Sequence, residues 1–273
     1  FYRYAAADIV VPEDKPKAVS LALVGGLVAA IFGPEISYRL IGAVDGALYA
    51  GCFIGAALVQ CLALPVLLGM PKLAVEIREK QGRPISAFLR LPAFRLALCS
   101  AALGYAVMSF LMTAVPLQIV NVSLLGEALN ARVIQWHVIA MFAPSFFIGS
   151  LITRFGIRAI MTAGLVLYIT GIIVALSGLQ FWYYFATLFF VGLGWNFLYI
   201  AGTSLVTLVT EPEERGRVQG ITDMTVFTAV ACASLSAGII HTIGGWHIMA
   251  LAALLPISII GVTIAMTSKS SLP

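Results

Sequence analysis

The chain has 273 residues, of which 61% are hydrophobic and only 10% are charged, and its formal net charge is +4. A soluble domain carries about 25% charged residues, so this composition excludes an ordinary soluble protein and indicates one that crosses a membrane repeatedly. The sequence contains no basic patch with interleaved aromatic residues, which argues against nucleic-acid binding.

Apolar runs long enough to cross a bilayer recur along the chain, since a spanning helix needs about 20 residues. The fold is therefore predicted to be all-α and polytopic. We predict eight spans, at residues 18–36, 43–69, 94–116, 132–152, 157–178, 182–209, 218–240 and 246–267.

The one substantial polar stretch, residues 70–93, is predicted to link two helical bundles and to hold a short amphipathic helix at 72–80. Basic residues mark the cytoplasmic side of a membrane protein. With this linker in the cytoplasm, only Arg39 and Arg132 of the 16 Lys and Arg residues fall on the opposite side. The distribution therefore predicts a cytoplasmic linker.

A short pattern near the start of the chain is repeated 200 residues later. Residues 12–18 (PEDKPKA) align with residues 212–218 (PEERGRV), and each copy opens into a long apolar segment. The order of spans around the copies fits a duplicated unit of six helices, the design of many transporters. On this arithmetic the first unit lacks four helices, and we expect twelve spans in the intact protein.

The loop at residues 149–158, with sequence GSLITRFGIR, resembles the G-x-L-A-D-R-x-G-R-K loop of the major facilitator superfamily of secondary transporters. The repeated loops and the basic linker add to this resemblance. Thr153 replaces the aspartate of the motif. The resemblance implies that residues 1–69 end an N-terminal six-helix bundle, 70–93 form the central linker, and 94–273 form the C-terminal six-helix bundle.

A glycine-proline pattern in the first span is similar to the fifth-helix motif of antiporters in this superfamily. Ala29 stands where a glycine is usual, and Ser37-Tyr38 stands where the family has Gly-Gly. The residues either form an antiporter motif or serve helix packing alone, because glycine permits close approach and proline kinks or ends a helix. They are Gly25, Gly26, Gly33 and Pro34.

Charged residues at the predicted cytoplasmic ends suggest a gate. Arg154 and Arg158 could pair with Glu213 or Glu214 and close this side, and breaking such pairs would bias a two-state equilibrium. The alternative is that these charges only fix the topology.

Proton coupling needs a titratable group inside the membrane, and Asp223 and His137 are the candidates. Asp223 either couples or gates transport, or pairs with Arg215 or Arg217. His137 either titrates in a cavity wall beside Gln135, or is a packing histidine.

Aromatic and polar residues at the centres of two predicted spans suggest a substrate pocket for a flat or amphipathic organic molecule. Asn196 is also compatible with a simple helix–helix hydrogen bond. The candidate binding residues are Tyr105, Ser109, Gln135, His137, Trp195, Asn196 and Tyr199. Near a helix end, Trp182, Tyr183 and Tyr184 are predicted to form an interfacial belt.

The sequence thus predicts a bacterial inner-membrane secondary transporter that moves a small organic solute by alternating access, with proton coupling and efflux as the favoured details. We expect a monomer surrounded by lipid, and neither a cofactor nor an enzymatic site. The four cysteines lie in apolar stretches without a CxxC pair, so no metal site is expected. The alternatives are a uniporter or importer of a metabolite, and a truncated transporter-like protein without transport activity.

Overall fold

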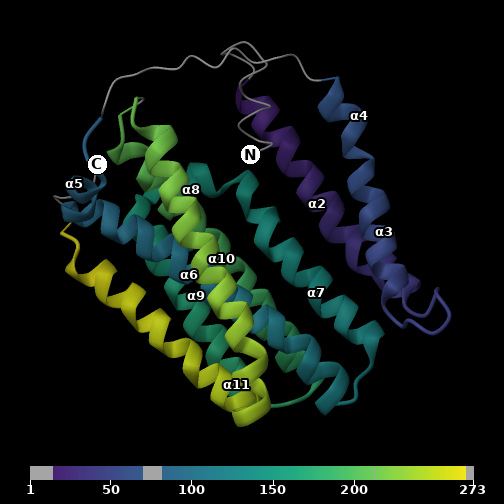
Figure 1. The fold of residues 1–273 in the computed structure, drawn as a ribbon. Helices are drawn as coiled ribbons and strands as arrows, with labels where there is room; N and C mark the ends of the chain where they lie inside the picture. Colours follow the sequence, from purple (N-terminus) through teal and green to yellow (C-terminus); the bar gives the residue numbers. More distant parts are fainter. Residues whose placement is uncertain (1–14, 70–81, 212, 269–273) are drawn as a thin grey trace.

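The computed structural model describes residues 15–69, 82–211 and 213–268, and within these ranges every regular element is a helix (Figure 1). The predicted all-α fold is confirmed. The predicted helix at 72–80 and the start of the first repeated loop, residues 12–14, lie outside the described residues. The helices are α2 (Lys15–Leu40), α3 (Ala50–Cys61), α4 (Ala63–Leu68), α5 (Ile85–Arg90), α6 (Pro92–Pro116), the π-helix η2 (Leu117–Val122), α7 (Glu127–Phe142), the 3₁₀ helix η3 (Ala143–Phe146), α8 (Ile148–Phe155), α9 (Ile157–Ser177), α10 (Phe181–Val209) and α11 (Arg215–Met266).

Four helices of the described chain are long and apolar enough to cross a membrane: Pro92–Val122, α9, α10 and α11. The pair Glu127–Phe146 and Ile148–Phe155, bent by 56°, gives a fifth if it is one span. The predicted number of eight spans is therefore not confirmed.

The second predicted span, residues 43–69, differs most from the structure. Gly42 and Gly46 have positive φ angles of 74° and 76° and form turns, so a helix begins only at Ala50. The apolar segment is then divided into α3 and α4, of 12 and 6 residues. The prediction rested on the uninterrupted apolar sequence, which indicates burial in a membrane. Such a sequence does not show where the backbone turns.

The longest element, α11, contains the last two predicted spans within 52 residues. Its backbone leaves helical geometry at Gly245, where φ is 66° and ψ is −171°. Glycine adopts such angles without steric cost. The two helical segments of α11 meet at this break, and the second runs back alongside the first in roughly the opposite direction (Figure 1).

The core is built by α6, α9, α10 and α11, which approach closely at glycines. A methyl group at Gly164 would lie 3.1 Å from the carbonyl oxygen of Gly194, and one at Gly202 would lie 2.9 Å from that of Ala97. Small residues permit this proximity between membrane helices. The main buried cluster contains only residues from Phe88 to Ile264, so this part of the chain has a core of its own.

Helix α2 packs on α7. A methyl group at Gly26 would lie 3.6 Å from the ring of Phe142, and Gln135 Nε2 donates a hydrogen bond of 2.6 Å to the carbonyl oxygen of Ile31.

Of the predicted packing glycines, Gly25 and Gly33 face open space in the described structure. Pro34 does not end its helix, because α2 continues to Leu40. One missing N–H removes one hydrogen bond, and the turns on either side persist.

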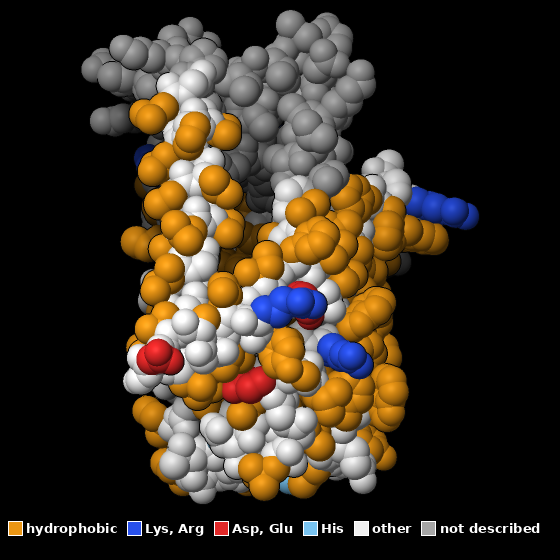
Figure 2. All heavy atoms as spheres, turned by 90° about the vertical axis from the view of Figure 1, so that its right-hand side faces the viewer, with side chains coloured by type: hydrophobic (Ala, Val, Ile, Leu, Met, Phe, Trp, Pro, Cys, Tyr) orange, Lys and Arg blue, Asp and Glu red, His pale blue; other side chains and the backbone are white. Residues whose placement is uncertain are grey.

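Hydrophobic side chains predominate on the face shown in Figure 2, where charged side chains are few. Phe53, Leu62 and Ile173 are among the large apolar residues that are more than half exposed. A surface of this kind is stable against lipid or protein. The structure thus agrees with a multi-pass membrane protein.

Candidate functional site

Three of the predicted binding residues form one aromatic cluster. The ring of Tyr105, on α6, lies with its centre 5.1 Å from Trp195 and 5.4 Å from Tyr199, both in edge-on geometry. Trp195 and Tyr199, one turn apart on α10, stack with their planes 10° apart and their centres at 5.1 Å. Helical spacing predicted that pair, and packing of α6 on α10 adds the third ring.

Two further rings extend this cluster onto neighbouring helices. Phe142, at the end of α7, lies 6.0 Å from Trp195, and Phe227, on α11, lies 6.2 Å from Tyr105. Sequence reasoning missed both. Phe227 lies four residues after Asp223, so the two share a face of α11, and this spacing could have revealed it.

Polar groups accompany the rings. Ser109 of α6 and Ser234 of α11 share a hydrogen bond of 2.7 Å. The Nε1 of Trp195 is buried and has no hydrogen-bond partner among the described residues. Ser109 lies one helical turn after Tyr105 on α6, so a hydroxyl pair and one unused donor accompany the flat apolar faces of the rings.

Asn196 packs helices together. It is fully buried, and its Nδ2 donates to the carbonyl oxygen of Met141 at 2.6 Å and to Ser145 Oγ at 2.7 Å. These bonds tie α10 to the end of α7 and to η3, which favours the helix–helix interpretation of this residue.

The hydrogen bonds of His137 and Gln135 go to groups outside the aromatic cluster. His137 is fully buried, and its Nδ1 lies 2.6 Å from the carbonyl oxygen of Leu188. Its Nε2 has no partner within the described part of the chain. Gln135 bonds to α2 as described above. His137 therefore packs between α7 and α10.

At the predicted cytoplasmic end, Glu214 pairs with Arg83 from the linker. Arg83 Nη2 donates to Glu214 Oε2 at 2.7 Å, while its Nε and backbone N donate to Oε1 at 3.0 and 2.7 Å. These hydrogen bonds lower the pKa of Glu214 to about 2 and raise that of Arg83. Glu214 is nevertheless only 3% exposed, so the arginine compensates a carboxylate removed from water.

In this structure the two arginines of the predicted gate have other partners. The guanidinium of Arg154 lies 5.1 Å from the ring centre of Phe155, and Arg158 donates to the carbonyl oxygen of Thr267. In the described structure neither arginine pairs with Glu214, because the fork of Arg83 already occupies both carboxylate oxygens. Glu213 is exposed.

Asp223 is half-buried on α11, and within the described chain its side chain forms no ion pair with Arg215 or Arg217. Arg217 instead donates to the carbonyl oxygen of Arg83. The arginine pairing considered for Asp223 is therefore absent from the described structure, and the carboxylate lies one helical turn before Phe227 of the aromatic cluster.

A buried polar network lies near the opposite ends of the helices. Ser123 Oγ lies 2.8 Å from Tyr184 Oη, Gln118 Nε2 donates to Tyr184 Oη at 3.1 Å, and His241 Nε2 lies 2.9 Å from Gln118 Oε1. Tyr184 was predicted to be interfacial and is fully buried, because its hydroxyl has these partners and its ring packs on Trp246. Among the described residues, none of these hydrogen bonds involves a predicted binding residue.

Residues 118–270 match the sequence model of the Major Facilitator Superfamily. The chain belongs to this superfamily. Its members are transporters, so the predicted family and the non-enzymatic character are both confirmed. The α8–α9 corner shows the family's tight loop, in which Gly156, with φ of 83°, is the only residue between the two helices.

Three relatives resemble the chain over most of its length. The riboflavin transporter RfnT of Brucella anthropi is 43% identical over 90% of this chain and 63% of the relative. The uncharacterized MFS-type transporter YdeG of Bacillus subtilis is 30% identical over 87% of this chain and 59% of the relative. YddS, another uncharacterized MFS-type transporter of that organism, is 26% identical over 91% and 61%. The chain thus spans about 60% of the length of these relatives.

Proposed function

We propose that this protein is a secondary transporter that moves a small planar organic solute of the flavin type. The observation that carries the proposal is the cluster of Tyr105, Trp195 and Tyr199. Aromatic rings favour stacked or edge-on contact with another flat ring. The hydroxyl groups of Ser109 and Ser234 can bond its polar substituents. The 43% identity to a riboflavin transporter supports this solute class.

The proposed transport cycle is alternating access between two bundles, with residues 1–69 in the first and 94–273 in the second. The main core cluster, from Phe88 to Ile264, supports the second bundle. We propose that the protein works as a monomer in the inner membrane and couples to protons through Asp223, with Arg154, Arg158 and Glu213 at the cytoplasmic gate.

The test is transport of radiolabelled riboflavin in membrane vesicles that contain the full-length protein. Uptake and export are both measured, because the sequence favoured export and left import as an alternative. Tyr105→Leu should raise KM about five- to tenfold, since an aromatic contact contributes about 1 kcal/mol. Trp182→Leu is the matched control, because Trp182 is an exposed aromatic residue of α10 outside the cluster.

The amount of protein in the membrane is measured by immunoblot for each variant. Absence of riboflavin transport by the unmodified protein would refute the solute class. Wild-type KM in Tyr105→Leu would refute the role of the aromatic cluster.

A further inference from the structure

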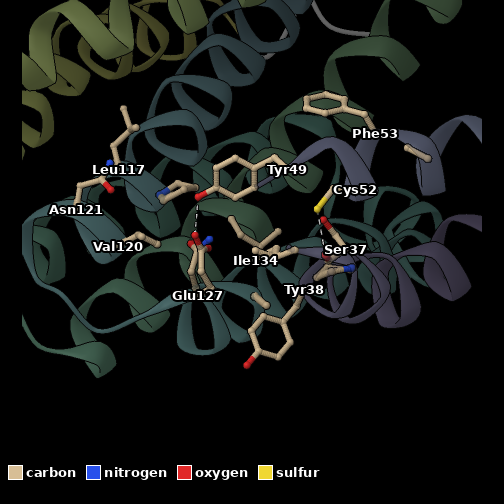
Figure 3. A pocket seen from close by; sticks show the side chains of 16 residues that line it. Ser37, Tyr38, Tyr49, Cys52, Phe53, Leu117, Val120, Asn121, Glu127 and Ile134 are labelled. Carbon is tan, nitrogen blue, oxygen red and sulfur yellow. Dashed lines mark hydrogen bonds between the residues drawn. The ribbon is translucent and has the colours of Figure 1, made fainter. Parts of the chain in front are cut away.

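A cavity of about 760 Å³ lies between the N-terminal helices and the start of the C-terminal bundle, and none of its lining residues belongs to the aromatic cluster (Figure 3). Its walls come from the end of α2, the start of α3, η2 and the first turns of α7. The hydroxyl of Tyr49 points to Glu127 and donates a hydrogen bond of 2.7 Å to Oε1. This end of the molecule carries Arg39 and Arg132 and is the predicted external side.

The cavity has one carboxylate and no balancing cation. Glu127 lines it, and no Lys, Arg or His is among the described residues that do. A cleft lined by charge of one sign raises the local concentration of solutes of the opposite sign and opposes those of the same sign. The cavity should therefore admit neutral or cationic solutes and reject anions.

The Glu127 carboxylate also supplies hydrogen-bond acceptors to this cavity. Its Oε1 accepts one bond from Tyr49, and a carboxylate can accept several. A solute bearing hydroxyl or N–H groups would supply further donors to these oxygens.

Aromatic side chains also line the cavity. Tyr38, Tyr49 and Phe53 line the cavity together with aliphatic side chains from η2 and α7. Its volume lies within the roughly 300–1,000 Å³ of small-molecule sites. A flat ring therefore fits it both in chemistry and in size.

We propose that this cavity is a second, external binding site, which admits uncharged, hydroxyl-bearing planar solutes and rejects their anionic counterparts through Glu127. For the solute class this inference rests on the proposed function. Riboflavin and riboflavin 5′-phosphate are the discriminating pair, because they share the ring and differ by a negatively charged group.

Cys52 provides a reporter inside the cavity, where its Sγ lies 3.2 Å from the carbonyl oxygen of Ser37. In the full-length protein with every other cysteine replaced by serine, Cys52 is treated with a cationic or an anionic membrane-impermeant methanethiosulfonate. The ratio of cationic to anionic modification rates should fall about tenfold in Glu127→Gln, because one charge at close range has been removed.

Tyr49→Phe is the matched control, since it removes the hydrogen bond and leaves the carboxylate. It should keep the wild-type ratio. An unchanged ratio in Glu127→Gln would overturn the proposed charge selection. This measurement contains no flavin, so its result does not depend on whether riboflavin is transported.

The second measurement adds the solutes. Riboflavin should slow the modification of Cys52, riboflavin 5′-phosphate should not, and Glu127→Gln should allow the phosphate to protect. Equal protection by both solutes in the unmodified protein would contradict the proposal, as would no protection by riboflavin in a protein that transports it.

Discussion

Glu214 illustrates how one residue can stabilise a membrane protein outside the bilayer. Its carboxylate is nearly inaccessible to solvent, yet Arg83 donates to both of its oxygens. Leaving a buried charge without its partner is far more damaging than losing an exposed ion pair. The pair should therefore act as a structural lock between the linker and the α10–α11 turn.

The low pKa of Glu214 gives this lock a pH dependence of known sign. A carboxyl whose pKa falls from 4.5 to about 2 on folding stabilises the fold above the unfolded value. That contribution is lost as the pH falls from about 4.5 toward 2. We expect the melting temperature of the solubilised full-length protein to fall across this window, and to fall less in Glu214→Gln.

Glu213→Gln is the control for this titration, because Glu213 is the exposed neighbour. It should retain the wild-type dependence of melting temperature on pH. If Glu214→Gln lost stability over the same window by the same amount as the unmodified protein, the ion pair would not be the source.

At the scale of elements, the glycines between α9 and α10 determine how closely these helices pack. A methyl group at Gly194 would lie 2.6 Å from a ring carbon of Tyr168 and 3.0 Å from the carbonyl oxygen of Gly164. We expect Gly194→Ala to destabilise the bundle by about 1–3 kcal/mol, the usual cost of overpacking. Thermal unfolding in detergent measures it.

Gly238→Ala, on α11, is the matched control substitution, since a methyl group at Gly238 would meet no atom within 4 Å. It should leave the melting temperature unchanged or slightly raised, because alanine favours helix. Equal losses in both variants would show that helix propensity, and not the α9–α10 contact, decides the result.

The predicted helices and the observed ones differ where a turn has no polar residue to mark it. The ends of α9 and α10 lie close to their predicted positions because polar or glycine residues interrupt the apolar runs there. The turn before Ala50 was missed because it depends on backbone angles at Gly42 and Gly46 within an apolar segment. Hydrophobicity reports burial in lipid and is insensitive to such angles.

For the candidate site, residues on one helix were easier to predict than contacts between helices. Trp195 and Tyr199 follow from spacing on α10, whereas the choice between pocket and packing for Asn196 depended on Met141 and Ser145 of neighbouring elements. Arg83 was assigned to the linker without a partner, because nothing local brings it to Glu214, 131 residues later.

At the scale of the whole molecule, proton coupling is a property of the cycle rather than of one contact. Asp223 lies on the face of α11 that carries Phe227, beside the aromatic cluster. We expect Asp223→Asn to abolish accumulation of riboflavin driven by a pH gradient while facilitated exchange continues. Vesicle transport with and without an imposed gradient distinguishes the two.

Asp45→Asn serves as the control, because Asp45 is an exposed carboxylate in the turn before α3, and it should leave gradient-driven accumulation intact. Normal accumulation in Asp223→Asn would eliminate this residue as the coupling group.

The Arg83–Glu214 lock also limits where the chain can be altered. A side chain at Gly82 would begin 2.4 Å from Glu214, and Phe88 is fully buried among the residues of the C-terminal bundle. The last part of the predicted 70–93 linker therefore belongs mechanically to that bundle. Insertions, fusion tags or protease sites placed between Gly82 and Phe88 should destabilise the protein, although the polar composition there is that of a linker.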